Sequence, residues 1–237
     1  EIPLRLVGSE MCIRDRYLGE QIDIHAGGED LIFPHHENEI AQSEAANGKG
    51  FSKYWLHNGF LNIDNRKMSK SLGNFFTVRE IGEKYDLQVL RFFMLSAHYR
   101  SPLNFSAELM EAAKNGLERI VTAAEHLKFL LEGAKTENMT EKEQAKIVKS
   151  QEFTRKFEKA MDDDFNTADA IAAVFDLVKF INTNTDGESS KEYLQNLLSQ
   201  LVALTDVLGI IVEKEQEMLA DDIEALIAER QLSLIHI

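Results

Sequence analysis

The 237-residue sequence has one cysteine, no long apolar run and no excess of positive charge, and each absence narrows its class. A single cysteine cannot form an internal disulfide framework, which agrees with a reducing cytoplasm. No apolar stretch approaches the roughly 18 residues that a membrane-spanning helix needs, and no secretory signal is visible. We therefore expect a cytoplasmic globular protein without membrane attachment.

The charge balance bears on possible partners. The chain has 26 basic and 40 acidic residues, a formal net charge of -14 at pH 7. Because phosphate contacts require Lys and Arg, charge alone argues against a nucleic-acid partner. Binding of nucleic acid would need a local basic surface on a net acidic protein. The length permits one large domain or two smaller ones.

A short basic loop follows the alternating stretch 60–64, which predicts a strand. Lysine ammonium groups and serine hydroxyls can contact a polyphosphate, and a glycine lets the backbone approach it closely. The capping box 77–80 predicts a helix directly after the loop. On spacing alone a solvated lysine loop is the simpler interpretation. The loop residues concerned are Lys67, Ser69, Lys70, Ser71 and Gly73.

A second candidate site lies nearer the N-terminus. The alternating stretch 22–25 predicts a strand that ends in a glycine pair, and α/β sheets bind ligands at the carboxyl ends of their strands. His25 lies at this end. Asp30 lies just beyond, where its carboxylate could bind a substrate ammonium group or equally cap the next turn. Trp55 and His57 are interpreted as core residues.

A helix is predicted to begin at Pro34, a natural first helical residue. In that helix His35 and Glu39 are four residues apart and would share one face. An imidazole and a carboxylate on one face form half of a zinc site, although such pairs are also common on surfaces without metal.

The second half of the sequence predicts helices throughout. Ser106 is the expected N-cap of a long helix that ends at Gly133, and a second capping box opens a helix at Thr140. Together the apolar stripes indicate an up-and-down bundle. The acidic triplet 162–164 is explained by the dipole of the helix that follows, without a metal. The stripe of the long helix is expected to comprise Leu109, Ala113, Leu117, Ile120, Ala124, Leu127 and Leu131.

These motifs carry a resemblance to a known family. Residues 67–71, Lys-Met-Ser-Lys-Ser, match in full the KMSKS signature of class I aminoacyl-tRNA synthetases. Residues 35–45, His-His-Glu-Asn-Glu-Ile-Ala-Gln-Ser-Glu-Ala, are similar to the cysteinyl-tRNA synthetases, and this run is far more specific. Stretches 22–28, 55–59 and 99–105 add to the similarity, which extends from about residue 17 to about residue 231.

The resemblance implies an α/β plus all-α fold. The expected parts are the C-terminal part of a Rossmann-like class I catalytic domain at 17–105, a connecting long helix at 106–134, and a helical, DALR-like anticodon-binding bundle at 135–231. It also implies a cysteine–tRNA ligase, which uses ATP with Mg²⁺ to activate cysteine to cysteinyl-adenylate and transfers the cysteine to tRNA(Cys). A cytoplasmic monomer is expected for the intact enzyme. The bundle could bind the tRNA or serve as scaffold.

Residue roles follow from the same resemblance. Lys67 and Lys70 would be the catalytic lysines, and with Ser69 and Ser71 they would contact ATP. His25 and Asp30 would bind the substrate. The resemblance implies that His35 and Glu39 hold a zinc ion together with two cysteines, and that this zinc accepts the substrate thiolate and so selects cysteine over serine.

The two ends depart from the family. Residues 1–16 and 232–237 resemble translated sequencing adapter and are expected to be non-native. The family places a zinc cysteine where this chain has Glu10, so Cys12 is out of register and is not expected to be a ligand. Because both zinc cysteines and the ATP-binding HIGH signature are missing, we expect the chain as written to be inactive alone.

Two alternatives remain open. The related ligase that joins cysteine to an amino sugar in thiol biosynthesis shares the zinc helix and the KMSKS loop, but it resembles this chain less at 37–46. A non-catalytic tRNA-binding or scaffold protein derived from a synthetase would need no chemistry. The intact Lys67, Lys70, His35 and Glu39 weigh against such decay.

Overall fold

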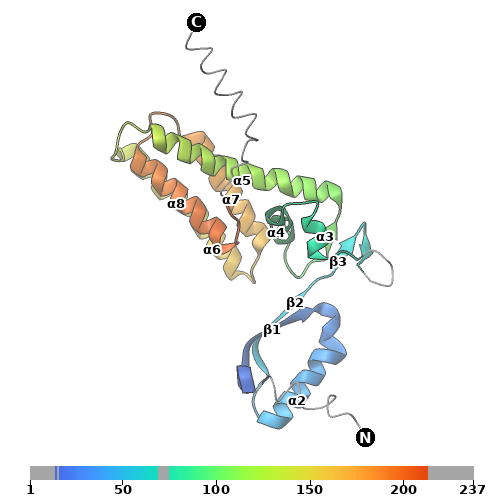
Figure 1. Ribbon diagram of the computed structural model, residues 1–237. Coiled ribbons are helices and arrows are strands. Elements are labelled where there is room, and N and C mark those ends of the chain that lie inside the picture. The colour runs from blue at the N-terminus through green and yellow to red at the C-terminus, as the bar shows by residue number, and fades with distance from the viewer. Residues whose placement is uncertain (1–13, 15, 69–74, 213–237) are drawn as a thin grey trace.

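The structure, a computed structural model, describes residue 14 and residues 16–68 and 75–212. Figure 1 shows a small α/β part at one end and a larger, mainly helical part at the other. Ser69, Lys70 and Ser71 lie outside the described residues, as do Cys12 and residues 213–237. The predictions made for those positions are therefore not addressed by the structure.

The small part is built on two parallel strands, β1 (Ile22–Gly28) and β2 (Ser52–Asn58). Parallel strands need a crossover connection. Here it consists of a 3-10 turn η1 (Glu29–Leu31), a π-helical turn η2 (Ile32–His36) and helix α2 (Glu37–Asn47). Gly48, at φ 64°, ends α2 in the left-handed conformation that favours glycine. Strand β1 was predicted from the alternating stretch 22–25, whereas β2 was not recognised from the sequence.

A second sheet connects the small part to the helices. It has the order β4–β3–β5, with β3 (Leu61–Ile63) antiparallel to β4 (Arg66–Lys67) and parallel to β5 (Leu103–Phe105). Asp64 and Asn65 form the β3–β4 turn with φ of 47° and 62°, the signs that a tight hairpin turn needs. The predicted strand at 60–64 is thus confirmed in its central residues.

Two short helices follow, α3 (Val78–Gly82) and α4 (Leu87–Leu95). The predicted capping box is present at the start of α3. The Glu80 amide donates to the Thr77 hydroxyl at 3.2 Å, and the Thr77 amide donates to the Glu80 carboxylate at 2.7 Å.

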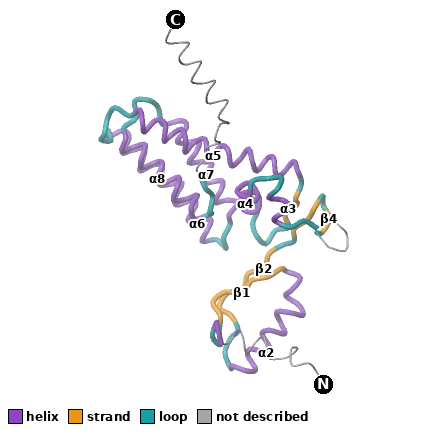
Figure 2. The backbone as a smooth tube through the Cα atoms, viewed as in Figure 1, coloured by secondary structure: helices purple, strands orange, loops and turns teal. Residues whose placement is uncertain are grey.

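Four long helices form the bundle shown in Figure 2. Helix α5 packs against α4, α7 and α8, while α6 packs against α7 and α8. The centre of the bundle is formed by fully buried residues that include Met110, Ile120, Leu127, Leu177, Ile181, Leu194, Leu197 and Leu201. The bounds are α5 (Ala107–Gly133), α6 (Glu141–Asp162), α7 (Thr167–Asn184) and α8 (Lys191–Val207). The predicted α/β plus all-α class is confirmed.

One detail of the predicted apolar stripe is wrong. Leu109 is 43% exposed, whereas its neighbour Met110 is fully buried. The buried face of α5 therefore begins at Met110, one residue further along. Ser106 caps α5 as predicted, because its hydroxyl accepts the Leu109 amide. Among the described helices none combines the length and the apolar character needed to cross a membrane.

Candidate functional site

Aromatic and imidazole side chains gather on one face of the β1–β2 sheet. The strand register pairs His25 with Trp55 and Gly27 with His57. Because side chains alternate between the two faces of a strand, these positions share one face. His36, at the end of η2, reaches the same face from the crossover, and it is buried.

The rings contact one another closely. His25 lies 4.8 Å from both the His36 and the Trp55 ring centroids, and 5.0 Å from Phe51. Trp55 stacks on His57 at 5.9 Å with an interplanar angle of 12°. Phe51 is buried and closes the cluster. Of these residues Phe51 and His36 are buried, whereas His25, Trp55 and His57 are half-buried.

Within this apolar setting the histidines are ordered by direct polar contacts. His36 Nδ1 and His57 Nε2 lie 2.8 Å apart, so one ring donates a hydrogen bond to the other. Burial lowers the pKa of His57, and the charges of His36 and Arg100 add to this effect. His57 is thereby kept neutral at pH 7.

Three groups in this cluster are arranged as metal ligands. One potential ligand atom from each of His25, His36 and Glu39 lies within 4.8 Å of the other two. His25 Nε2 is 2.8 Å from Glu39 Oε2. Although the Glu39 side chain is 45% exposed, its Oε2 atom is buried. The close contact with His25 does not have the geometry of a hydrogen bond, and this oxygen accepts none from the described residues. A buried carboxylate oxygen without a hydrogen bond is costly unless a cation or a charged imidazole faces it.

The donor set fits zinc. Two imidazole nitrogens and one carboxylate oxygen are ligands that zinc takes, and zinc sites have four ligands in all. Gly27 leaves room for this arrangement, because a Cβ there would lie 2.9 Å from His36 Cε1 and 3.0 Å from His36 Nε2. Gly27 and Gly28 are the last residues of β1 and not the turn after the strand that the sequence had predicted. The missing side chain of Gly27 is needed for the packing of His36.

The predicted site residues are only partly brought together. His25 and Glu39 belong to the cluster, whereas His35 is exposed and outside it. The reason is local: η2 contains a non-helical residue, Phe33 at φ -131° and ψ 131°, and its last residue His36 turns toward Glu39 at a spacing of three. The role of His35 as a ligand stays a prediction.

Asp30 lies in η1 beside the glycine pair and is exposed. A Cβ at Gly28 would lie 2.6 Å from its Oδ1, so the carboxylate sits against the backbone at the end of β1. Its proposed contact with a substrate ammonium group stays a prediction. His36 and His57 were missed as site residues, and the signal that could have found them is the pairing of β1 with β2.

The KMSKS loop leaves the second sheet. The backbone of Lys67 pairs with Asn62, and the Met68 amide donates to the Leu61 carbonyl at 3.2 Å. The Asn104 side chain accepts the Asn65 amide at 2.7 Å, which ties the β3–β4 turn to β5. The start of the loop is thus held on both sides. Ser69, Lys70 and Ser71, for which phosphate contacts were predicted, lie outside the described residues.

Comparison with known proteins identifies two regions of this chain. Residues 9–115 match the family model described as tRNA synthetases class I (C) catalytic domain, and residues 156–213 match the DALR domain. The first match begins inside the stretch predicted to be non-native, and that assignment stays a prediction.

Curated relatives named "Cysteine--tRNA ligase" match most of this chain. The protein of Lachnospira eligens is 66% identical over 216 residues, and that of Lachnoclostridium phytofermentans is 58% identical over 221 residues. The protein of Clostridioides difficile is 56% identical over 215 residues. Each match covers 91% of this chain and 46% to 47% of the relative, so the chain spans about half the length of these proteins.

A solved structure shares the fold. It is the LeuRS of Agrobacterium radiobacter K84 in a ternary complex with tRNA and LeuAMS, with a TM-score of 0.63 and 20% identity, covering 77% of this chain and 25% of that one. At this identity the likeness concerns the fold alone. With its catalytic-domain and DALR matches and with relatives up to 66% identical, the chain belongs to the cysteinyl-tRNA synthetase family of class I aminoacyl-tRNA synthetases.

Proposed function

We propose that this chain is part of a cysteine–tRNA ligase, which activates cysteine with ATP and transfers it to tRNA(Cys) in the cytoplasm. The observation that carries the proposal is the zinc-type cluster of His25, His36 and Glu39 on one face of the parallel β1–β2 sheet. Cysteine and serine differ by one atom, and shape discriminates poorly between such similar side chains. A metal site next to the substrate provides the missing discrimination by chemistry.

His25, His36 and Glu39 would hold the zinc. Glu39 is the one ligand that both the geometry of the cluster and the family resemblance indicate. When bound, zinc supplies a Lewis acid with an affinity for thiolate sulfur that a hydroxyl group does not match. His57 orients the His36 ring through their 2.8 Å contact. Trp55 and Phe51 pack against the His25 ring, and Asp30 is proposed to bind the substrate ammonium group.

The KMSKS loop would act on ATP. We propose that Lys70, assisted by Lys67, stabilises the negative charge on the phosphates as the cysteine carboxylate attacks the α-phosphate and pyrophosphate leaves. Ser69 and Ser71 would add hydroxyl donors, and Mg²⁺ would accompany the ATP. The anchoring of β4 to β3, and of their turn to β5, supports this role because it fixes the start of the loop.

The helical bundle would bind tRNA. The DALR match supports this assignment, as does the fold that the chain shares with the LeuRS of a tRNA complex. Helix α6 carries six Lys and Arg against five Asp and Glu residues, a net charge of +1 in a chain of net charge -14. Lys149, Arg155 and Lys159 on this helix are exposed. They offer positive groups for phosphate contacts along α6, among the exposed carboxylates Glu152 and Glu158.

The test is cysteine-dependent exchange of pyrophosphate into ATP, measured on the full-length protein with and without zinc. We expect exchange with cysteine, exchange near background with serine, and loss of exchange when a chelator removes the metal. Subsequent incubation with tRNA(Cys) should yield cysteinyl-tRNA. Activation of cysteine followed by transfer to an amino sugar and not to tRNA would overturn the proposal.

A further inference from the structure

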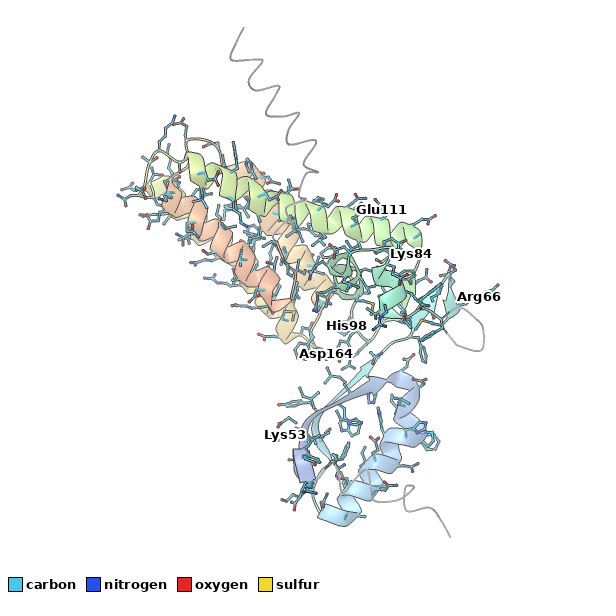
Figure 3. All side chains as sticks on the ribbon, in the orientation of Figure 1. Lys53, Arg66, Lys84, His98, Glu111 and Asp164 are labelled. Carbon is cyan, nitrogen blue, oxygen red and sulfur yellow. The ribbon has the colours of Figure 1, made fainter. Side chains whose placement is uncertain are left out.

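The Asp164 carboxylate contacts three side chains of residues 98–100, a turn that is distant in the sequence. Asp164 lies between α6 and α7, and the hydroxyl of Tyr99, 65 residues earlier, donates to its Oδ1 at 2.7 Å. Arg100 Nε lies 2.6 Å from the other carboxylate oxygen, and His98 Nε2 lies 3.8 Å from it. Figure 3 shows His98 and Asp164 together where the helical bundle approaches the α/β part.

The three partners also order one another. His98 Nδ1 accepts the Arg100 amide at 3.2 Å, which leaves its Nε2 side toward the carboxylate. The His98 ring stacks on Tyr99 at 4.9 Å, and Arg100 Nε donates to the Tyr99 hydroxyl at 3.1 Å. The hydrogen bond from Tyr99 lowers the pKa of Asp164, and Arg100 lowers it further, so the carboxylate is ionised at neutral pH.

The backbone of the same turn is attached to the end of β2. The Gly59 amide, two residues after His57, donates to the Tyr99 carbonyl at 2.8 Å. A Cβ at Gly59 would lie 2.6 Å from the carbonyl carbon of Ser101, so glycine is needed for this approach. Tyr99 therefore contacts the site strand with its backbone and the bundle with its side chain.

The turn that presents Asp164 is itself unusual. Asp164 and Phe165 have φ of 57° and 54°, in the left-handed region that side chains other than glycine rarely adopt. Such backbone costs free energy, on the order of 1 kcal/mol or more per residue, and persists where the surroundings impose it. Thr167 makes an additional contact by donating its hydroxyl to the Ala97 carbonyl at 3.4 Å. The strained turn and the start of α7 thus contact residues 97–100 through the side chains of Asp164 and Thr167.

An ordinary surface ion pair contributes little, because solvent screens it and side-chain entropy opposes it. Asp164 differs because it combines a tyrosine hydroxyl and a guanidinium, both held by their own neighbours. Its neighbour Asp163 makes no side-chain hydrogen bond or ion pair among the described residues. The contact with residues 98–100 is therefore made by Asp164 and not by its neighbour Asp163. The helix dipole accounts for the presence of acidic residues here, but it does not account for this contact.

We propose that Asp164 is a positioning residue that fixes the helical bundle to the end of β2, so that RNA held by the bundle meets the His25–His36–His57 cluster in one orientation. The RNA part of this statement rests on the proposed function. The connection itself, from Asp164 through Tyr99 to Gly59, does not depend on it.

The test compares Asp164→Asn with Asp163→Asn in the full-length protein. Asparagine keeps the size of the side chain and its tolerance of the left-handed backbone, while it removes the charge. We expect amide hydrogen exchange at Gly59 and over 99–105 to become about tenfold faster in Asp164→Asn and to stay unchanged in Asp163→Asn. Tyr99→Phe, which removes one hydroxyl, should shift the same amides in the same direction by a smaller factor.

The kinetic arm separates positioning from general damage. In Asp164→Asn we expect kcat/KM for tRNA to fall about tenfold, while cysteine-dependent pyrophosphate exchange stays within about twofold of the unaltered protein. Unchanged amide exchange in both Asp164→Asn and Tyr99→Phe would overturn the proposal, as would equal losses in both reactions. If the unaltered protein showed no cysteine-dependent exchange, the proposed function would fail while the amide data still decided whether Asp164 makes this connection.

Discussion

His36 Nδ1 and His57 Nε2 face each other across 2.8 Å, and only one of these two nitrogens can carry the shared proton. When the proton is on His36, its Nε2 has a free lone pair, and that atom lies beside Gly27. When the proton is on His57, His36 Nε2 carries a hydrogen and cannot bind a metal. Metal binding by His36 therefore selects the tautomer with the proton on His36 Nδ1, in which His57 Nε2 accepts the hydrogen bond.

Replacing Glu39 by Gln should lower zinc affinity at least about tenfold, because a neutral amide is a much weaker ligand than a carboxylate. Competition titration of zinc against a chromophoric chelator measures this directly. Glu37→Gln, two residues earlier on the same helix and exposed, is the control and should bind zinc normally. Equal affinities of Glu39→Gln and Glu37→Gln would remove Glu39 from the metal site.

The same titration on His35→Ala and His36→Ala identifies the histidine ligand. From the arrangement of His25, His36 and Glu39 we expect His36→Ala to weaken binding. Weaker binding confined to His35→Ala would instead return the role to the residue that the family resemblance implies. In that case the η2 turn would have to rearrange when the metal binds.

Gly27→Ala should destabilise the β1–β2 part by about 1–3 kcal/mol, because its new methyl group overlaps a buried ring and the core cannot expand freely. The methyl carbon would lie 2.9 Å from His36 Cε1 and 3.2 Å from Leu31 Cδ1. Urea unfolding followed by Trp55 fluorescence reports on this part of the chain. The control is Gly133→Ala, where a Cβ meets nothing within 4 Å. A Gly27→Ala protein as stable as the control would show that His36 can move aside.

Local signals in the sequence were sufficient to predict where three of the helices begin. The capping boxes at Thr77 and Thr140 and the cap at Ser106 are hydrogen bonds between residues three apart, so their pattern is readable without the fold. The His36–His57 contact joins residues 21 apart and depends on the register of two strands. Spacing along one helix therefore selected His35, whereas the assembled sheet brings His36 to Glu39.

Glu143 should make the bundle sensitive to acid. Burial alone would raise its pKa, but hydrogen bonds from Ser190 and Thr140 outweigh this effect and lower the pKa below its ordinary value of 4.5. Because the folded protein binds this proton less readily than the unfolded chain, the stabilisation is present above pH 4.5 and is lost as the pH falls through the lower, folded value. Unfolding free energy measured by urea titration should decline over this range.

Glu143→Gln should remove that part of the pH dependence and destabilise the bundle by about 1–3 kcal/mol. The carboxylate accepts from the Ser190 amide at 2.9 Å and from the Thr140 amide at 2.8 Å, and a side-chain NH₂ group would face one of these donors with a second donor. Glu141→Gln, exposed in the same first turn, is the matched control. Identical acid profiles for the two variants would contradict the role of Glu143.

The exposed basic residues of α6 should contribute to tRNA affinity. Lys149→Glu combined with Arg155→Glu is expected to weaken tRNA binding at least about tenfold. It should also reduce the slope of log affinity against log salt by about one for each phosphate that the helix no longer touches. Binding is measured by fluorescence anisotropy at several salt concentrations. Lys84→Glu combined with Arg79→Glu, which changes the net charge by the same amount near α3 and outside the bundle, is the control for net charge. Because this chain is already strongly acidic, a general charge effect would weaken binding in the control as well, whereas a phosphate contact on α6 changes the salt slope in the α6 variant alone.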